Sequence, residues 1–166
     1  VGPTAVKGSD ICEILYTSGT SGIPKGVPRR HVDVLGNRWA SSVSRGFCSD
    51  DVLLALPDFA HTLGLNGILL RSMMLGATMV LCRSNNVLER ARFIQLHKVT
   101  VLVGPPSLFD SLLMSGPAGL AALSCIRLAS LGSTTILPEL VTKLLEAGVE
   151  SIASGYGMTE CGSISS

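Results

Sequence analysis

The sequence of 166 residues has little charge, no paired cysteines and no unbroken apolar run long enough to cross a membrane. Charged residues make up 15% of the chain and hydrophobic residues 46%, and the formal net charge is +1. Apart from the neighbours Arg29 and Arg30, the basic residues are scattered, so we expect no nucleic acid partner. The longest apolar stretch, 63–82, contains Asn66 and Arg71, which argues against a transmembrane segment.

The cysteines exclude two kinds of framework. Each is at least 34 positions from the next and none forms a CxxC pair; they are Cys12, Cys48, Cys82, Cys125 and Cys161. Neither a zinc site nor a disulfide-stapled domain has this spacing. No secretory signal pattern opens the chain. We therefore expect reduced thiols in a cytoplasmic protein.

The hydrophobic content is high for a free-standing domain of this size. It has two explanations, a parallel sheet covered on both faces and a surface that a missing segment should cover, and we expect both. The chain begins at Val1 instead of Met and stops at Ser166 in a Gly/Ser-rich stretch. We therefore expect residues 1–166 to be a partial domain with both ends cut.

Short apolar runs alternate with segments of helical periodicity along the whole chain. The runs typical of strands are 11–16, 52–56, 77–82, 100–103, 126–131 and 151–153. Helices are expected over 31–44, 87–97, 108–113 and 137–145. This order predicts an α/β fold with a mostly parallel sheet and right-handed crossover helices. Ligands of such sheets bind in the loops that follow the strands.

The loop after the first expected strand has the composition of an anion-binding loop. It reads Tyr16-Thr17-Ser18-Gly19-Thr20-Ser21-Gly22-Ile23-Pro24-Lys25-Gly26-Val27. Glycines allow backbone N–H groups to face phosphate oxygens, hydroxyls add donors, and Lys25 supplies a positive charge. The loop does not have the spacing of a triphosphatase P-loop, because Gly26 follows the lysine where that pattern has Ser or Thr. A flexible Gly/Ser linker is the structural alternative.

This loop resembles, nearly residue for residue, the signature phosphate loop of the adenylate-forming superfamily. That superfamily includes acyl-CoA synthetases, luciferases and the adenylation domains of peptide synthetases. The resemblance implies that the chain is part of the large N-terminal domain of such an enzyme. It also implies that Lys25 and the loop from Thr17 to Gly22 hold the β- and γ-phosphates of ATP.

The segment Ser154-Gly155-Tyr156-Gly157-Met158-Thr159-Glu160 resembles the family's adenylate-binding motif. By that resemblance Tyr156 lies near the adenine, Thr159 binds the α-phosphate and Glu160 binds Mg²⁺ together with the phosphates. A hard cation prefers a carboxylate and phosphate oxygens, so this assignment is chemically sound. Considered alone, the segment would be a turn with a solvated acid.

Two further segments resemble pocket motifs of the family. Pro57-Asp58-Phe59-Ala60-His61-Thr62-Leu63-Gly64 is similar to the aromatic/His motif, although Ala60 separates the aromatic residue from the histidine. This places His61 near the substrate carboxylate; its structural alternative is a packed histidine. Gly132-Ser133-Thr134-Thr135 stands where the family has a loop that lines the acyl and adenine pockets, and it would otherwise be an ordinary strand-to-helix loop.

The resemblance implies that the parent enzyme activates a carboxylic acid with ATP to form an acyl-adenylate, then passes the acyl group to a thiol such as coenzyme A. Lys25, His61, Thr159 and Glu160 would act in the first step. None need act as a base, because a carboxylic acid with a pKa of about 4 is already ionised at neutral pH. Apolar residues suggest an acyl or aromatic substrate; they are Leu63, Leu65, Ile68, Leu69 and the segment Val103-Gly104-Pro105-Pro106.

Several alternatives stay open from the sequence. An amino-acid-activating domain is disfavoured because no Asp is evident where such domains anchor the substrate amine. A non-catalytic nucleotide-binding remnant and a triphosphatase-type switch also remain. No Gly-x-Ser-x-Gly elbow points to a hydrolase. The downstream Asp, hinge and lid domain of the family are absent from these residues, so we expect the fragment alone to be inactive.

Overall fold

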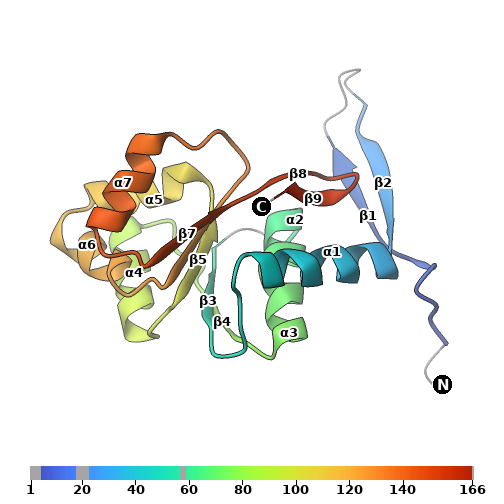
Figure 1. Ribbon diagram of the computed structural model, residues 1–166, viewed down its shortest axis with the longest axis horizontal. Helices are drawn as coiled ribbons and strands as arrows, with labels where there is room; N and C mark the ends of the chain where they lie inside the picture. The colour runs from blue at the N-terminus through green and yellow to red at the C-terminus, as the bar shows by residue number, and fades with distance from the viewer. Residues whose placement is uncertain (1–4, 18–22, 57–58, 166) are drawn as a thin grey trace.

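The structure is a computed structural model that describes residues 5–17, 23–56 and 59–165. Its centre is a parallel sheet with the strand order β4-β3-β5-β6-β7 (Figure 1). The strands are β3 (Val52–Ala55), β4 (Thr78–Leu81), β5 (Val101–Gly104), β6 (Leu128–Leu131) and β7 (Ser151–Ser154). This confirms the α/β class and five of the expected strands.

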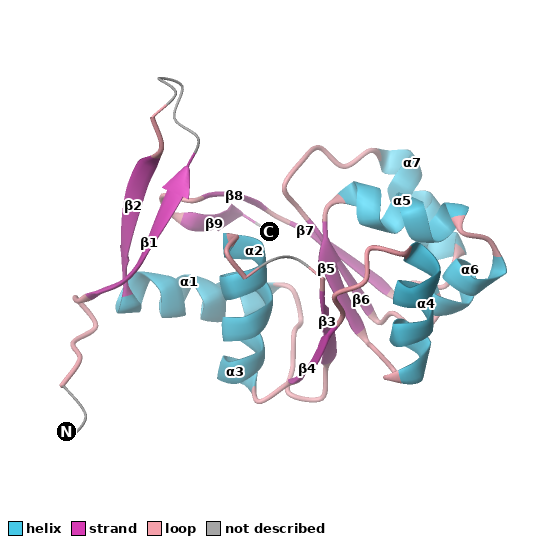
Figure 2. Ribbon diagram, turned by 180° about the vertical axis from the view of Figure 1, so that it is seen from behind, coloured by secondary structure: helices cyan, strands magenta, loops and turns pink. Residues whose placement is uncertain are grey.

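Helices cover both faces of the sheet (Figures 1 and 2). One face carries α4 (Val87–Leu96), α5 (Pro106–Met114), α6 (Pro117–Leu123) and α7 (Pro138–Glu146). Successive side chains of a strand point to opposite faces of the sheet, so the protein has two hydrophobic cores. Leu54 and Leu102 lie in the core under α4–α7. Leu53 and Val101 lie in the core on the other face, with Ile68. Residues buried on both faces read in the sequence as continuous apolar runs.

The second face carries α1 (His31–Ser44) and one continuous helical segment, built from α2 (Thr62–Gly64), a π-helical stretch η1 (Leu65–Leu70) and α3 (Arg71–Leu75). The strand order reverses at β3: β4, the next strand in the sequence, lies on one side of β3, and β5 lies on the other side. Such a reversal of strand order is where open α/β sheets bind ligands, at the carboxyl ends of the strands.

The expectation that the first strand joins the parallel sheet and leads into a helix is wrong. β1 (Ile11–Thr17) pairs antiparallel with β2 (Lys25–Arg30) in a separate hairpin, with Thr17 opposite Lys25. β2 is hard to predict because it contains Gly26, Pro28 and two arginines, which strands disfavour. The loop that we expect to bind phosphate therefore follows β1 and precedes β2, and α1 follows β2.

A second hairpin was also not predicted. β8 (Tyr156–Met158) pairs antiparallel with β9 (Gly162–Ser165), and it lies beside α1. The segments expected as loops after β7 therefore form an ordered two-stranded unit, and the predicted adenylate motif is its first half.

The helix α1 buries mainly polar side chains and exposes apolar ones. Its buried residues include Arg38, Ser41 and Ser42, whereas Trp39 and Val43 are 56% and 64% exposed. The chain thus exposes apolar surface as well as covering its sheet. No helix in the described parts of the chain is long and apolar enough to span a bilayer.

Candidate functional site

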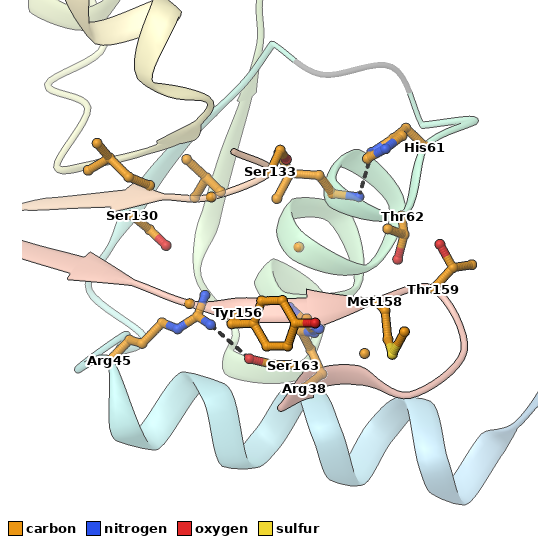
Figure 3. A pocket seen from close by; sticks show the side chains of 18 residues that line it. Arg38, Arg45, His61, Thr62, Ser130, Ser133, Tyr156, Met158, Thr159 and Ser163 are labelled. Atoms are coloured by element: carbon orange, nitrogen blue, oxygen red, sulfur yellow. Dashed lines mark hydrogen bonds between the residues drawn. The ribbon is translucent and has the colours of Figure 1, made fainter. Parts of the chain in front are cut away.

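A cavity of about 290 Å³ lies beyond the carboxyl ends of β5, β6 and β7, beside α1 and the start of α2 (Figure 3). It is lined by residues from three of the four segments that resemble family motifs: His61, Gly132, Ser133, Gly155, Tyr156, Gly157, Met158 and Thr159. These segments are far apart in the sequence and meet here because parallel strands deliver their following loops to one edge of the sheet.

His61 has both a structural contact and a place in the cavity. It is the N-cap of α2, and its Nδ1 accepts a hydrogen bond from the backbone N–H of Leu63 at 3.1 Å. A neutral imidazole that accepts at Nδ1 carries its proton on Nε2. The capping contact therefore fixes the ring and leaves Nε2 as the donor for a ligand oxygen. The structural and functional interpretations of His61 are compatible.

The loop after β6 lines the opposite wall of the cavity. Gly132 and Ser133 both contribute, and Ser133 has φ of +74°, in the left-handed region. A non-glycine residue there costs of the order of 1 kcal/mol or more, and such residues gather at binding sites. Thr134 lines a neighbouring hollow with Thr135, Ile136 and the segment Ser154–Gly157.

Residues Gly155, Tyr156 and Gly157 line both this hollow and the cavity, so this strand forms a wall between them. Tyr156 is 65% exposed, and its ring is among the side chains that line the cavity in Figure 3. Two compartments that share one wall can hold two joined parts of a ligand. An exposed aromatic ring at such a junction suits stacking against a flat base.

The side chain of Asn37 attaches the β8–β9 hairpin to α1. Asn37 Nδ2 donates to the backbone oxygens of Ser163, at 2.8 Å, and Cys161, at 3.3 Å, and Asn37 Oδ1 accepts from the Ser163 N–H at 3.0 Å. The approach is so close that a Cβ on Gly162 would lie 2.6 Å from Asn37 Oδ1. Thr159 and Glu160 lie in the turn held by these contacts.

Two arginines of the α1 region also line the cavity. Arg45 Nη2 donates to Ser163 Oγ at 2.8 Å, and a Cβ on Gly155 would lie 1.8 Å from the same nitrogen. Arg38 is only 9% exposed, and burial first, then the charges of Arg45 and Arg29, lower its pKa to about 10. Sequence reasoning missed both residues, since arginines on a helix are normally solvated.

Besides Thr134, three of the predicted residues that the structure describes lie outside the cavity. Lys25 is exposed at the first position of β2, and the half-buried Thr17 faces it across the hairpin. Glu160 is exposed and lines a separate hollow with Arg29 and Asn37. The residues from Ser18 to Gly22 lie outside the described part of the chain, so the structure does not show the phosphate loop itself.

The apolar lining is smaller than the sequence suggested. Leu63 and Val103 do line the cavity. Leu65 and Leu69 instead line a groove against Val34 of α1, and Ile68 is fully buried in the core under the sheet. The π-helical stretch turns these side chains away from the site, and sequence periodicity does not reveal such a stretch.

The described residues include no group of three or more His, Cys, Asp or Glu that could hold a metal ion on its own. Mg²⁺ commonly binds through one or two carboxylates with substrate phosphates and waters. The exposed carboxylate of Glu160, next to Thr159 and in a hollow that Asp33 also lines, fits this second kind of site.

The hairpin that carries Lys25 is tied to the cavity wall by a buried polar contact. Glu13 of β1 accepts from Asn66 Nδ2 at 3.0 and 3.2 Å and forms an ion pair with Arg29 of β2 at 3.3 Å. Asn66 Nδ2 also lies 3.3 Å from Thr62 Oγ1, and Thr62 lines the cavity. This contact fixes the base of the hairpin relative to His61 and α2.

Comparison with known proteins matches the family model described as AMP-binding enzyme to residues 2–166. A 3-[(3aS,4S,7aS)-7a-methyl-1,5-dioxo-octahydro-1H-inden-4-yl]propanoyl:CoA ligase of Mycobacterium tuberculosis is 33% identical over 157 residues, which are 94% of this chain and 31% of that protein. A long-chain-fatty-acid–CoA ligase of Bacillus subtilis is 32% identical over 156 residues, with coverages of 91% and 27%.

Solved structures of related enzymes have the same fold. Apo MatB from Rhodopseudomonas palustris superposes with a TM-score of 0.87 at 25% identity, covering 98% of this chain and 32% of that one. Its ATP-bound form gives 0.82 at 27% identity, with coverages of 95% and 31%. The chain spans about a third of the length of the relatives that it matches.

Proposed function

We propose, from the premise that this chain belongs to the AMP-binding enzyme family, that its parent protein activates a carboxylic acid with ATP and transfers the acyl group to coenzyme A. The observation that carries the proposal is the shared wall Gly155–Gly157 between two compartments, one bordered by His61 and the other by the loop at Thr134. An acid and a nucleotide in adjoining compartments would have their reactive groups meet at this wall.

In the first step a carboxylate oxygen of the acid attacks the α-phosphorus of ATP. The bond from that phosphorus to the bridging oxygen breaks, and pyrophosphate leaves. His61 Nε2 would donate to the carboxylate and orient it, and Thr159 would hydrogen-bond the α-phosphate. Such a reaction needs charge stabilisation and alignment more than a protein base.

We assign the polyphosphate to Lys25 and to the loop from Thr17 to Gly22, and the adenine to Tyr156. Glu160 would hold Mg²⁺, which neutralises phosphate charge when bound. The exposed position of Lys25 at the start of β2 suits a side chain that must reach a large, solvated anion.

In the second step the thiol sulfur of coenzyme A would lose its proton to solvent and attack the acyl carbon, the bond from that carbon to the phosphate oxygen would break, and AMP would leave with its electron pair. The acceptor is proposed because the curated relatives described above are named CoA ligases. Their named acids differ, so the comparisons do not identify the acid used here. The free cysteines suit the reducing cytoplasm, where we place the reaction.

The decisive experiment measures pyrophosphate release by the full-length parent with ATP, Mg²⁺ and a panel of short, long, aromatic and dicarboxylic acids. Acid-dependent release that falls about 10-fold or more in both K25A and E160A, equivalent to about 1.4 kcal/mol of transition-state stabilisation, supports the proposal. A folded parent that binds ATP but releases pyrophosphate with none of the acids contradicts it, and points to a nucleotide-binding module.

A further inference from the structure

Three arginines share the space between α1, α3 and the β8–β9 hairpin without an acidic partner. Arg38 and Arg45 line the cavity, and Arg71, only 1% exposed, lies behind them. The ion pairs formed among the described residues are Arg29–Glu13, Arg30–Asp33 and Arg127–Asp51. None of these involves the three arginines, and the one carboxylate whose charge acts on Arg38 is that of Glu13, which pairs with Arg29.

Arg71 is satisfied by neutral groups. Its Nε and Nη2 donate to the hydroxyls of Ser42 and Ser41, both at 3.1 Å, and its guanidinium lies 3.8 Å from the centre of the Phe47 ring. Burial first, then the charges of Arg38 and Arg45, lower its pKa to about 8. Arg71 therefore adds positive potential to the site without needing a ligand.

Arg38 and Arg45 are not satisfied in this way. The Arg38 guanidinium donates to Asn37 Oδ1 at 3.2 Å, and its buried Nε has no partner in the described structure. Arg45 donates to Ser163 Oγ, and its buried Nε is likewise unpartnered. These two Nε atoms are buried away from the cavity, but both side chains line it, and a buried guanidinium charge is costly unless an anion offsets it.

The position of these donors identifies where the anion would lie. Arg38 and Arg45 are seven positions apart, which puts them on one side of α1 about two turns from each other. His61 lies on a different wall of the same cavity, on α2 (Figure 3). The cavity thus has a single-donor wall at His61 and a doubly cationic wall at α1.

We infer that the acid activated by this protein carries a second anionic group, most simply a second carboxylate, which pairs with Arg38 and Arg45 while the reacting carboxylate lies at His61. The inference rests on the proposed function and names the substrate class, a compact dicarboxylic acid. Guanidinium groups recognise carboxylates with paired, charge-assisted hydrogen bonds, and a cavity of about 290 Å³ suits a short diacid. This replaces the apolar or aromatic acid that the sequence suggested.

The test compares acids that differ in one charge. Pyrophosphate release by the full-length parent would be measured with succinate and glutarate and with their monomethyl esters. We expect kcat/KM to favour each diacid over its ester by about 10- to 100-fold, the range for a hydrogen bond to a charged group. That ratio should fall about 10-fold or more in R38M and in R45M.

Arg92→Met is the matched control, because Arg92 is an exposed arginine on α4 outside the cavity, and its ratio should not change. Arg45 is only half-buried, so R45M decides the matter if the melting curve shows that R38M does not fold. R38K keeps the positive charge and should retain part of the diacid preference. If Arg38 acted only through packing, R38K and R38M would leave the diacid-to-ester ratio equally unchanged.

The outcomes are distinct. Release with esters and monoacids but no preference for diacids overturns this inference and leaves the proposed function standing. A rise in KM for ATP in R38M and R45M, with an unchanged diacid-to-ester ratio, overturns it too and identifies the anion as a nucleotide phosphate. No release with any acid contradicts the proposed function itself.

Discussion

Asn37 of α1 and Ser163 of β9 hold each other through two hydrogen bonds across 126 positions of the chain, one donated by Asn37 Nδ2 at 2.8 Å and one accepted by Asn37 Oδ1 at 3.0 Å. A third bond reaches the Cys161 oxygen. This amide side chain, together with the bond from Arg45 Nη2 to Ser163 Oγ, holds the turn that presents Thr159, although Asn37 does not itself line the cavity.

We predict that Asn37→Ala lowers kcat/KM for pyrophosphate release about 10-fold or more, because the turn at Thr159 loses its attachment to α1. Asn85→Ala, at an exposed loop position, is the control and should change little. Thermal unfolding of both variants separates a local effect from a global one. An N37A enzyme with normal kcat/KM would show that the hairpin holds its place without this side chain.

Gly155 yields a second prediction, from the space around it. Its added Cβ would lie 1.8 Å from Arg45 Nη2, so G155A must displace the guanidinium and break its bond to Ser163 Oγ. We expect a loss of diacid preference together with weaker adenylation in the assay above. The control is Gly36→Ala, where an added Cβ meets nothing within 4 Å.

Gly36 lies inside α1, so G36A should raise the free energy of unfolding by about 0.5–1 kcal/mol, as Ala replaces Gly in a helix. Chemical denaturation of both variants measures this. Equal activity of G155A and wild type would show that Arg45 has room to move, and would weaken its role at the cavity.

Glu13 is the basis of a third prediction, which concerns stability. Among the described residues it is the only ion-pair partner of Arg29, a side chain just 4% exposed. Breaking a buried pair on one side leaves an uncompensated charge, so we expect E13Q to lower the free energy of unfolding by about 3 kcal/mol. Asp33→Asn breaks the exposed pair with Arg30 and should have no measurable effect.

Urea denaturation of the full-length protein, monitored separately for each variant, tests this difference. If E13Q and D33N are equally stable, Arg29 must find another partner, and the link from β1 to Asn66 is not needed to hold the hairpin.

The sequence predicted those helices and strands that are determined by the pattern of their own residues. The helix 137–145 and the five parallel strands follow from periodicity and apolar runs, and the structure has them with nearly the same bounds. The β8–β9 hairpin was missed because its short, exposed strands are defined by a contact with Asn37, far away in the chain. No local pattern contains that information.

The motifs predicted the candidate site, but the arginines of the α1 region belong to no motif and were missed. His61 and the residues of 155–159 do meet at one cavity. Arg38 escaped notice because its stripe with Ser41 and Ser42 is polar, and a polar stripe normally faces solvent. Here that stripe is buried and the apolar side with Trp39 is exposed, so the usual assignment of helix faces is reversed.

His61 allows its two contacts to be separated, which gives the last prediction. Asparagine is among the best N-cap residues, so H61N can still accept from the Leu63 N–H and should keep the stability of α2. It has no atom at the position of Nε2, however, so it cannot donate into the cavity. We expect H61N to unfold at the wild-type temperature while its kcat/KM falls about 10-fold or more.

Glutamine at position 61 places an amide nitrogen near the position of Nε2 but caps α2 poorly, so H61Q should lose stability and keep more activity than H61N. If H61N is the more stable variant in the melting assay and H61Q the more active one in the pyrophosphate assay, capping and substrate contact are separate roles of one side chain. If both variants instead lose activity in proportion to their loss of stability, His61 acts only through the cap, and the reacting carboxylate must be held by another group on the cavity wall.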